Sequence, residues 1–368
     1  MRQGWDYKKL GDLCDIYQPK TLATEQLVVD GKYYVYGANG IIGRYNDYNH
    51  EQSEILLTCR GATCGTINIS QPYSWINGNA MVIHRKSEDL SFDFLKYLML
   101  SLDYSLIITG AAQPQITRQK IAPIIVKFPS LSVQQSIVSE LDKINELIRL
   151  KKEQLKDYDN LAQSIFYEMF GDPVVNEKGW EVKKIGEIGT VERGAGISKK
   201  DFVEDGLPCI HYGQLHTILG PTTRHHHSCI PESLLPKYKI AHTNDVIMAI
   251  TSEDVEGSCK STAWLGNYDI VIGSDAAILH HEQDGTFLSY YTMTKAFFNE
   301  KSKYAKGFKV THISAKEIEN IPVYLPPLAL QKDFAKRIEV IEQQKENIKS
   351  TIQDLETLLA SRMQYWFD

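Results

Sequence analysis

The chain of 368 residues contains a long internal repeat, and no other feature of the sequence restricts its fold as strongly. Residues 4–11, with the sequence GWDYKKLG, return 175 positions later as GWEVKKIG at 179–186. Residues 116–131 return 197 positions later at 313–328. Because the offset grows by 22 between these two anchors, the second copy carries additional residues between them. We therefore expect two domains that share one framework and differ in their insertions.

Each copy ends in a segment with the heptad pattern of a coiled coil. From Ile137 to Met169 the seam positions alternate in spacing between four and three residues, with Lys151 as the polar interruption. The same spacing returns 197 positions later, where Lys345 and Arg362 interrupt it. The seam side chains that we expect to form a spacer and a partner-docking surface are Ile137, Leu141, Ile144, Ile148, Leu155, Ile338, Ile341, Ile348, Ile352 and Leu355.

The two heptad segments are long enough to be rods. Roughly 37 residues at ~1.5 Å per residue give a helix of about 55 Å, and two such helices in one chain would most simply pack on each other. Ser132 and Gln135 have the spacing of a capping box, which places the start of the first helix just after Pro129.

The segments before the rods have a different pattern. Short apolar and β-branched runs alternate with Gly, Asn and Asp turns, as expected for a globular α+β domain with one packed helix per copy. We predict four consecutive parts, namely a globular domain, a long helix, a second globular domain and a second long helix, at residues 1–132, 133–172, 173–329 and 330–368.

Charge and composition exclude several classes of protein. The net charge of −6 argues against a protein that coats nucleic acid by bulk electrostatics. The first globular part has a net charge of +1, the second −3, and the two helical parts −3 and −1. Acidic helices favour docking of protein over binding of DNA, although an ordinary solvated face would look the same. The chain lacks an apolar run of membrane-spanning length and a secretory leader, so we expect a cytoplasmic protein.

The sequence also lacks the motifs of catalysis. It has no Asn-Pro-Pro or Asp-Pro-Pro methyltransferase motif, no phosphate loop, because Ala195 stands where Lys would be required, and no Cys-x-x-Cys pair. Asp172, Glu181 and Lys183 would suit a metal-dependent nuclease, but Glu181 and Lys183 belong to the repeated framework. The histidines at 225–227 fit no zinc spacing, so a polar loop is the better interpretation. We predict no catalytic residue and no metal site.

The remaining chemistry lies in polar, glycine-rich loops. In the first copy these loops carry amides and cations of the types that read adenine and guanine edges, although a hairpin packed by its own tyrosines is an equally good interpretation of residues 33–45. The candidate DNA-binding residues of the first copy are Asn39, Arg44, Arg60, Thr63, Gln113, Gln115 and Arg118. Those of the second copy are Tyr212, Gln214, Ser252, Lys260, Lys309, Thr311 and His312.

Several short motifs, taken in repeat order, together resemble one known family. They are YGANGIIG at 36–43, RGATCG at 60–65, QPQIT at 113–117, PCIHYG at 208–213, TSED at 251–254, and the joints at 124–131 and 321–328. Each motif alone is weak. With the two heptad segments they cover essentially the whole chain, which thereby resembles a DNA specificity subunit of a type I restriction-modification system.

The resemblance implies an α+β fold in which two target-recognition domains alternate with two long helices packed as an antiparallel coiled coil, with pseudo-twofold symmetry. Each globular part would read one half of a bipartite target in double-stranded DNA. The helices would set the gap and dock two methyltransferase subunits, to which restriction subunits can add. Such a subunit is not an enzyme and has no cofactor of its own. S-adenosylmethionine, Mg²⁺ and ATP would be used by the partners, and no membrane is involved.

Two other hypotheses remain open on the sequence alone. One is a self-sufficient metal-dependent nuclease that relies on Glu181 and Lys183, and the other is a repeat scaffold that binds only protein. The sequence specifies neither the target words nor the gap, because no code relates these loops to bases.

Overall fold

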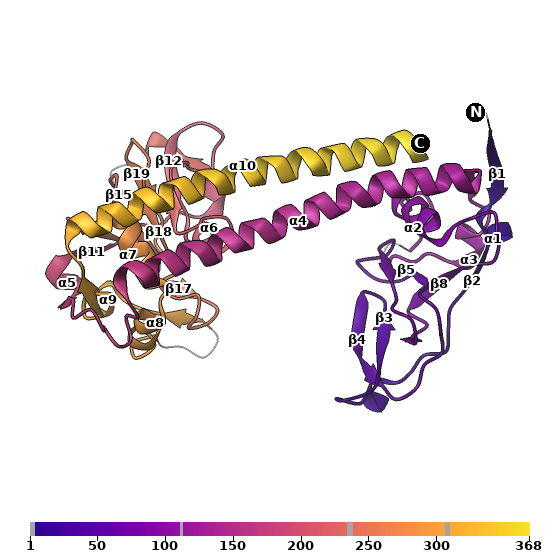
Figure 1. Cartoon of the computed structure of the whole chain (residues 1–368), viewed down its shortest axis with the longest axis horizontal. Coiled ribbons are helices and arrows are strands. Elements are labelled where there is room, and N and C mark those ends of the chain that lie inside the picture. The colour runs from indigo at the N-terminus through magenta and orange to yellow at the C-terminus, as the bar shows by residue number, and fades with distance from the viewer. Residues whose placement is uncertain (1–3, 111–112, 234–237, 306–309) are drawn as a thin grey trace. The chain divides into compact units, whose positions relative to one another are not determined.

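The computed structural model describes residues 4–110, 113–233, 238–305 and 310–368 (Figure 1). Contacts divide the chain into two units. Unit 1 comprises Met1–Lys152 and Ser350–Asp368, and unit 2 comprises Glu153–Lys349. The two long helices are α4 (Leu131–Phe170) and α10 (Leu328–Phe367). Each unit therefore holds one globular domain together with a part of both long helices.

Unit 1 is a mixed α+β structure. Its strands are β1 (Trp5–Lys9), β2 (Cys14–Tyr17), β3 (Tyr33–Gly37), β4 (Gly40–Tyr45), β5 (Ile55–Thr58), β6 (Ile67–Ile69), β7 (Trp75–Ile76), β8 (Ala80–Arg85) and β9 (Ile125–Pro129). Its short helices are α1 (Leu10–Leu13), a 3₁₀ turn at Thr24–Gln26, α2 (Phe92–Ser101) and α3 (Arg118–Ile121). The described strands form sheets in the orders β2-β8-β5-β6, β4-β3-β7 and β1-β9.

Unit 2 has the same framework with additional elements. Its strands are β10 (Glu181–Lys184), β11 (Gly189–Arg193), β12 (Leu207–Ile210), β13 (Thr222–Thr223), β14 (Ser228–Ile230), β15 (Lys239–Ala241), β16 (Val246–Ala249), β17 (Thr251–Ser252), β18 (Ser261–Trp264), β19 (Ile270–Ile272), β20 (Ala276–His281), β21 (Thr311–His312) and β22 (Pro322–Leu325). Its short helices are α5 (Ile185–Ile188), a 3₁₀ turn at Lys199–Asp201, α6 (Tyr212–Thr217), α7 (Gly285–Thr292), α8 (Lys295–Lys301) and α9 (Ala315–Glu319). The described sheets have the orders β11-β20-β16-β18-β13, β14-β12-β19-β15, β10-β22 and β17-β21.

The sequence repeat is present in the strand register. β2 pairs with β8 as β11 pairs with β20, and β5 pairs with β8 as β16 pairs with β20, all antiparallel. The parallel pair of β3 with β7 returns as β12 with β19. The register also agrees residue by residue, since Ile55 lies opposite Ile83 and Val246 lies opposite Leu279. Equivalent residues of the two copies can therefore be compared directly.

A buried glutamine joins each long helix to its globular domain. The Gln134 amide accepts a hydrogen bond from the Ser91 backbone N–H at 2.8 Å and donates to the carbonyl oxygen of Pro129 at 2.8 Å. Its equivalent, Gln331, accepts from the Asp284 N–H at 3.0 Å and donates to the carbonyl of Pro326 at 2.8 Å. Both glutamines are fully buried, and Ser91 and Asp284 are the N-caps of α2 and α7.

The predicted capping box of Ser132 and Gln135 is wrong. α4 begins at Leu131, so Ser132 lies inside the first turn, and the N–H groups of Val133 and Gln134 bond to the carbonyl of Ser130. The Gln135 side chain is exposed. Ser132 and Gln135 have the spacing of a capping box, but Gln134, which faces the domain, makes the contacts that hold this end of the helix.

The two long helices pack antiparallel, as predicted. In unit 1, Glu140 of α4 receives hydrogen bonds from Arg362 and Trp366, while Lys152 pairs with Glu356 at 2.8 Å. Residue numbers thus rise along one helix as they fall along the other. In unit 2, Lys345 of α10 pairs with Asp159 of α4 at 2.8 Å.

The polar interruptions of the second seam have partners. Arg362 binds Glu140, and hydrogen bonds from Arg362 hold the pKa of the Glu140 carboxyl below its usual range. Lys345 is buried and also pairs with Glu342 at 2.8 Å. Burial alone lowers the pKa of Lys345, but its hydrogen bonds to Asp159 and Glu342 outweigh burial and raise this pKa overall. The charge on Lys345 is therefore retained within the seam.

Each globular core includes residues of both long helices. In unit 1, Ile137 and Leu141 of α4 join Phe94, Phe128 and Phe367 in one apolar cluster. In unit 2, Phe166 and Phe170 of α4 pack against Phe287 of α7 and Phe334 of α10, with ring centroids 4.8–5.8 Å apart. Aromatic pairs of this kind add to the free energy gained from burial. The helices are therefore part of the domain cores.

Three further findings concern the described residues only. All six cysteines, which lie within them, are free thiols. These residues include no group of three or more His, Cys, Asp or Glu side chains placed to hold a metal ion. None of the helices among them is both long enough and apolar enough to cross a bilayer.

We predict that Gln134→Ala destabilises unit 1, because it leaves the Ser91 N–H and the Pro129 carbonyl without their partner in a buried place. Each such group costs about 1–3 kcal/mol. The matched control is Gln135→Ala, one residue along the same helix and exposed, which should cost less than ~0.5 kcal/mol. Thermal unfolding of the full chain compares the two variants. Equal melting temperatures would contradict the anchoring role of Gln134.

Candidate nucleic-acid interface

Two loops of the first copy meet beside the end of β5. Arg60 and Gln115 form an antiparallel backbone bridge, and the Gly61 N–H donates to the Pro114 carbonyl at 3.0 Å. The Ile116 N–H donates to the carbonyl of Cys59 at 3.0 Å. The structure thus brings together Arg60, which is exposed, and Gln115, which is half-buried. The nearby Gln113 is also exposed.

The turn between β3 and β4 lies against the same loop. Thr63 donates from its hydroxyl to the Asn39 side-chain oxygen at 2.5 Å, and both residues are exposed. The carbonyl of Ala38 accepts hydrogen bonds from Thr58 and Asn68, the latter at 3.4 Å. The side chains of Asn39 and Thr63 are therefore presented from a turn that is held by the sheet beneath it.

Two arginines of the first copy lie elsewhere. The Arg44 guanidinium donates to the Tyr34 hydroxyl at 2.9 Å and to the Gly31 carbonyl at 3.2 Å, and it stacks 4.3 Å from the Tyr34 ring centroid. These contacts hold the β3–β4 hairpin together and leave Arg44 poorly placed to read a base. Arg118 opens α3 and lines a separate cavity of about 270 Å³ with Lys9 and Asp12.

In the second copy, four of the candidates lie around the short pair of β17 with β21. Thr251 lies opposite His312, and the Thr251 hydroxyl is 3.1 Å from His312 Nδ1. Ser252 lies opposite Thr311, and both are buried. Lys260 is exposed, and its ammonium donates to the carbonyl of His216 at 3.1 Å. Of the polar side chains here, His312 and Lys260 are therefore the accessible ones.

The candidates on α6 serve the fold. Gln214 donates to the Ser228 hydroxyl at 2.8 Å and accepts from the His211 N–H at 2.9 Å, so both ends of its amide are occupied. Tyr212 is half-buried and lies against the His211 ring, with the centroids 4.6 Å apart. Lys309 lies outside the described residues.

Sequence reasoning missed an arginine that lies near the β17–β21 pair of unit 2. Arg193, at the end of β11, donates to the Ser274 carbonyl at 2.8 Å and lies 3.8 Å from the Asp275 carboxylate. Asp275 also accepts a hydrogen bond from the Thr251 hydroxyl at 3.2 Å. The signal that could have found Arg193 is the repeat itself, since the position 175 residues earlier, Gln18, lies beside Cys59 and therefore next to Arg60.

Comparison with known proteins bears on this duplicated arrangement. The family model described as "Type I restriction modification DNA specificity domain" matches residues 2–157 and 177–357, once in each copy of the repeat. The chain belongs to this DNA specificity family.

Curated relatives within the family are distant in sequence. The MjaVIII specificity subunit of Methanocaldococcus jannaschii is 23% identical over 97% of this chain and 92% of its own length. The EcoKI specificity subunit of Escherichia coli is 21% identical over 50% of this chain and 40% of its own length.

Solved structures agree with the family fold. The S subunit of a type I restriction-modification system from M. genitalium superposes with a TM-score of 0.59 at 14% identity, covering 99% of this chain and 96% of that one. A structure from a study of complex assembly in the type I system superposes with a TM-score of 0.58 at 18% identity, covering 99% and 97%. At these identities the likeness concerns the fold alone.

Two of the three residues considered for a nuclease, Glu181 and Lys183, lie within the residues that the family model matches. Glu181 and Lys183 lie on β10, which pairs with β22, and their side chains form an exposed ion pair at 3.3 Å. Asp172 accepts a hydrogen bond from the Val174 N–H at 2.9 Å.

Near the candidate interface, burial raises the pKa of the Cys59 thiol, so this sulfur is protonated at neutral pH and is a poor nucleophile.

The predicted seam positions do not form an accessible docking surface. Ile137, Leu141, Ile144, Ile148, Ile338, Ile341, Ile348 and Ile352 are buried, and Leu155 and Leu355 are half-buried. These side chains face inward, so a partner that docks on the helices must contact other positions.

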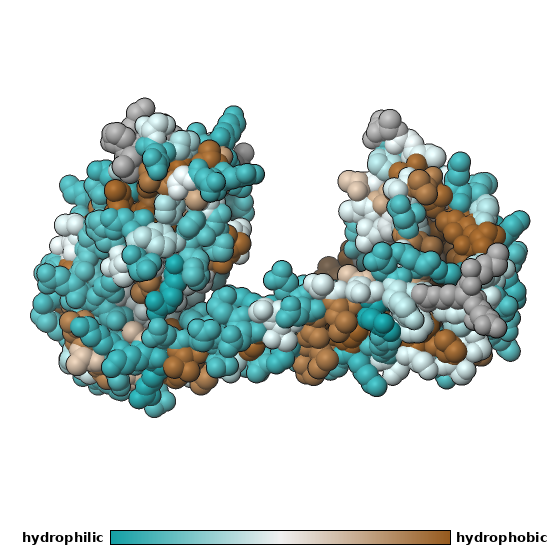
Figure 2. Space-filling model, turned by 90° about the horizontal axis from the view of Figure 1, so that it is seen from above, coloured by the Kyte–Doolittle hydropathy of each residue, from teal (hydrophilic) through white to brown (hydrophobic). Residues whose placement is uncertain are grey.

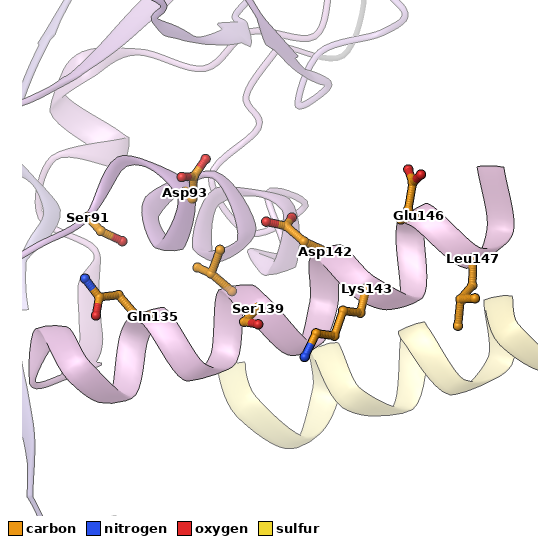
Figure 3. A pocket seen from close by; sticks show the side chains of 9 residues that line it. Ser91, Asp93, Gln135, Ser139, Asp142, Lys143, Glu146 and Leu147 are labelled. Atoms are coloured by element: carbon orange, nitrogen blue, oxygen red, sulfur yellow. The ribbon is translucent and has the colours of Figure 1, made fainter. Parts of the chain in front are cut away.

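A groove on unit 1 supplies such positions (Figure 3). It has a volume of about 900 Å³, runs along α4 beside the start of α2, and is lined by Ser91, Asp93, Gln135, Val138, Ser139, Asp142, Lys143, Glu146 and Leu147. Leu147 and Leu150 of α4 and Leu358 of α10 are each close to half exposed. Figure 2 shows hydrophobic surface gathered on this part of the helices. The groove thus combines apolar area with acidic side chains.

We predict that Arg44→Ala lowers the melting temperature of the chain, because the substitution removes two side-chain hydrogen bonds and the stacking on Tyr34. The expected cost is about 1–3 kcal/mol. The matched control is Arg60→Ala, since Arg60 is exposed and contributes its backbone to the bridge with Gln115. Arg60→Ala should change the melting temperature little. The reverse order would contradict the structural assignment of Arg44.

Proposed function

We propose that this chain is the DNA-recognition subunit of a type I restriction-modification complex, that its two copies each read one half of a bipartite target, and that it docks two methyltransferase subunits. The observation that carries the proposal is the duplicated framework, matched twice by a DNA specificity domain. In each copy the framework holds a different set of polar side chains beside the same strand ends. Two unlike sets at equivalent places suit two unlike half-sites.

Recognition would be shared unequally between this chain and its partners. With a net charge of −6, the chain cannot neutralise many phosphates, so we expect partners to supply most phosphate contacts. Each reader would then contribute specificity at about 1–3 kcal/mol per correct base pair. Because both readers belong to one chain, binding of the first half-site raises the effective concentration of the second reader at its own half-site.

The methyltransferase subunits would dock on the long helices. The groove of about 900 Å³ on unit 1 and the exposed leucines Leu147 and Leu358 offer an apolar area with acidic neighbours. Adenine methylation with S-adenosylmethionine and cleavage driven by ATP with Mg²⁺ would belong to the partner subunits. The chain itself would remain non-catalytic and would bind restriction subunits through the assembled complex.

We predict that the purified chain binds DNA non-specifically, with a Kd on the order of 10⁻⁴–10⁻⁶ M at physiological salt. Adding the cognate methyltransferase subunit should produce methylation at one bipartite sequence and raise affinity for that sequence on the order of 10³-fold or more. Fluorescence anisotropy and methylation profiling of genomic DNA measure the two effects.

Other outcomes of this reconstitution would contradict the proposal. Metal-dependent cutting of DNA by the isolated chain would favour the nuclease hypothesis, with Glu181→Gln and Lys183→Ala as the variants that should abolish it. A stable complex with the methyltransferase that neither crosslinks to DNA nor methylates any sequence would favour a scaffold that binds protein alone.

We also predict the effect of changing helix length. Inserting or deleting four residues, close to one helical turn or about 6 Å, in both α4 and α10 should alter the gap between the half-sites and leave both half-site sequences unchanged. The insertions belong near residues 150 and 350, where the two units divide. Methylation profiling of the reconstituted complex detects the change. An unaltered gap with normal activity would contradict a spacer role for the helices.

A further inference from the structure

Four positions in each copy meet at one corner of the domain, and the framework makes them equivalent in pairs. The pairs, first copy then second, are Gln18 and Arg193, Arg60 and Thr251, Asn79 and Asp275, and Gln115 and His312. They lie beyond β2, β5, β7 and the loop before α3 in the first copy, and at the equivalent ends in the second. Three residues of the first set and two of the second are exposed to solvent by more than a third of their surface.

The pair of Arg60 with Gln115 has a direct structural equivalent. Arg60 and Gln115 bridge antiparallel, as Thr251 and His312 do. The next residues repeat the link, since the Ile116 N–H donates to the Cys59 carbonyl at 3.0 Å and the Ile313 N–H donates to the Ile250 carbonyl at 3.0 Å. The backbone therefore places these two positions identically in both copies, whatever their side chains.

Gln18 and Arg193 make the same bond to the same backbone group. The Gln18 amide donates to the Gly78 carbonyl at 2.9 Å, and Arg193 Nε donates to the Ser274 carbonyl at 2.8 Å. Gly78 and Ser274 directly precede Asn79 and Asp275, the third pair. The Gln18 amide also donates to Cys59 Sγ at 3.0 Å, whereas the terminal nitrogen of Arg193 lies 3.8 Å from the Asp275 carboxylate.

The side chains that share this geometry differ in chemistry. The first set has three amide side chains and one guanidinium, with no carboxylate. In the second set, Arg193 and Asp275 lie 3.8 Å apart, and the Thr251 hydroxyl lies within 3.2 Å of both Asp275 and His312 Nδ1. Amides suit adenine edges, arginine suits guanine, and a carboxylate accepts from the cytosine amino group.

We propose that these four equivalent positions are the base-reading corner of each domain, and that the residues at them determine which word each half-site carries. This inference rests on the proposed function, namely recognition of a bipartite duplex. It assigns Gln18, Asn79, Arg193 and Asp275 a role in specificity. It also assigns a G·C pair to the half-site read by unit 2, contacted by Arg193 and Asp275, and an adenine-containing word to the half-site read by unit 1.

The test exchanges the corners within the full chain. The variant Q18R/R60T/N79D/Q115H gives the first copy the residues of the second, and R193Q/T251R/D275N/H312Q does the reverse. Each variant is assembled with the partner methyltransferase subunits and used to methylate genomic DNA, whose modified sites are then profiled. We expect the first variant to change only the half-site read by unit 1 and the second to change only the half-site read by unit 2. Methylation of the parental bipartite sequence by both variants would overturn the proposal.

Single substitutions guard against variants that fail to fold. For Gln115→His and Arg193→Gln, the ratio that matters is methylation of the parental sequence over methylation of sites altered in the half read by the changed domain. Each substitution should lower this ratio by about 10-fold or more. Discrimination in the other half should not change. The matched control is Gln52→His, the same replacement at an exposed position of the first globular domain, which should leave both half-site sequences unchanged. Equal loss in both halves from either single variant, or a change of word from the control, would also overturn the proposal.

These outcomes are separate from failure of the proposed function. If the wild-type complex methylates no bipartite sequence, the function is wrong and the corner has nothing to read. If the wild-type complex methylates such a sequence and the corner variants do not alter the corresponding half, the function stands and the assignment of the corner is wrong.

Discussion

The join between each long helix and its domain depends on one buried amide. The side-chain carbonyl of Gln134 or Gln331 accepts from the N-cap of the domain helix, and the side-chain amino group donates to a proline just before the long helix. A buried amide with both ends satisfied is tolerated in an apolar core, and with one end unpaired it is not. The glutamine therefore favours the observed orientation of helix against domain within each unit, next to the apolar clusters that contain Phe94 and Phe287.

Much of this architecture could be predicted from the sequence because the relevant signals are periodic. The heptad spacing predicted which residues of α4 and α10 are buried, including Ile137 and Ile338, and the repeat predicted two frameworks of the same kind. Periodicity reports which side of an element faces the core. It carries no information about the partner of a particular polar side chain, which is why the capping box at Ser132 was predicted and the anchor at Gln134 was not.

The candidate site illustrates the same limit. Arg44 looked like a base reader because it stands in a glycine-rich loop, but its guanidinium is engaged by Tyr34 across the hairpin. Arg193 was missed because no motif surrounds it, although the framework places it where Gln18 stands in the first copy. Which group engages each arginine depends on neighbouring strands and loops, and these neighbours become known once the strand register is known.

The buried ammonium of Lys345 has a consequence for how the two long helices find each other. Apolar heptads alone allow many alignments, because sliding by seven residues replaces one isoleucine by another. Lys345 meets Asp159 of α4 in the observed alignment, whereas its other partner, Glu342, lies one turn away on α10 itself. A slipped pairing would take Asp159 away from the buried ammonium and leave Glu342 as its remaining partner. One lysine thus favours a single register of the two helices. The same preference would act on a folding chain and on two separately made halves that are brought together.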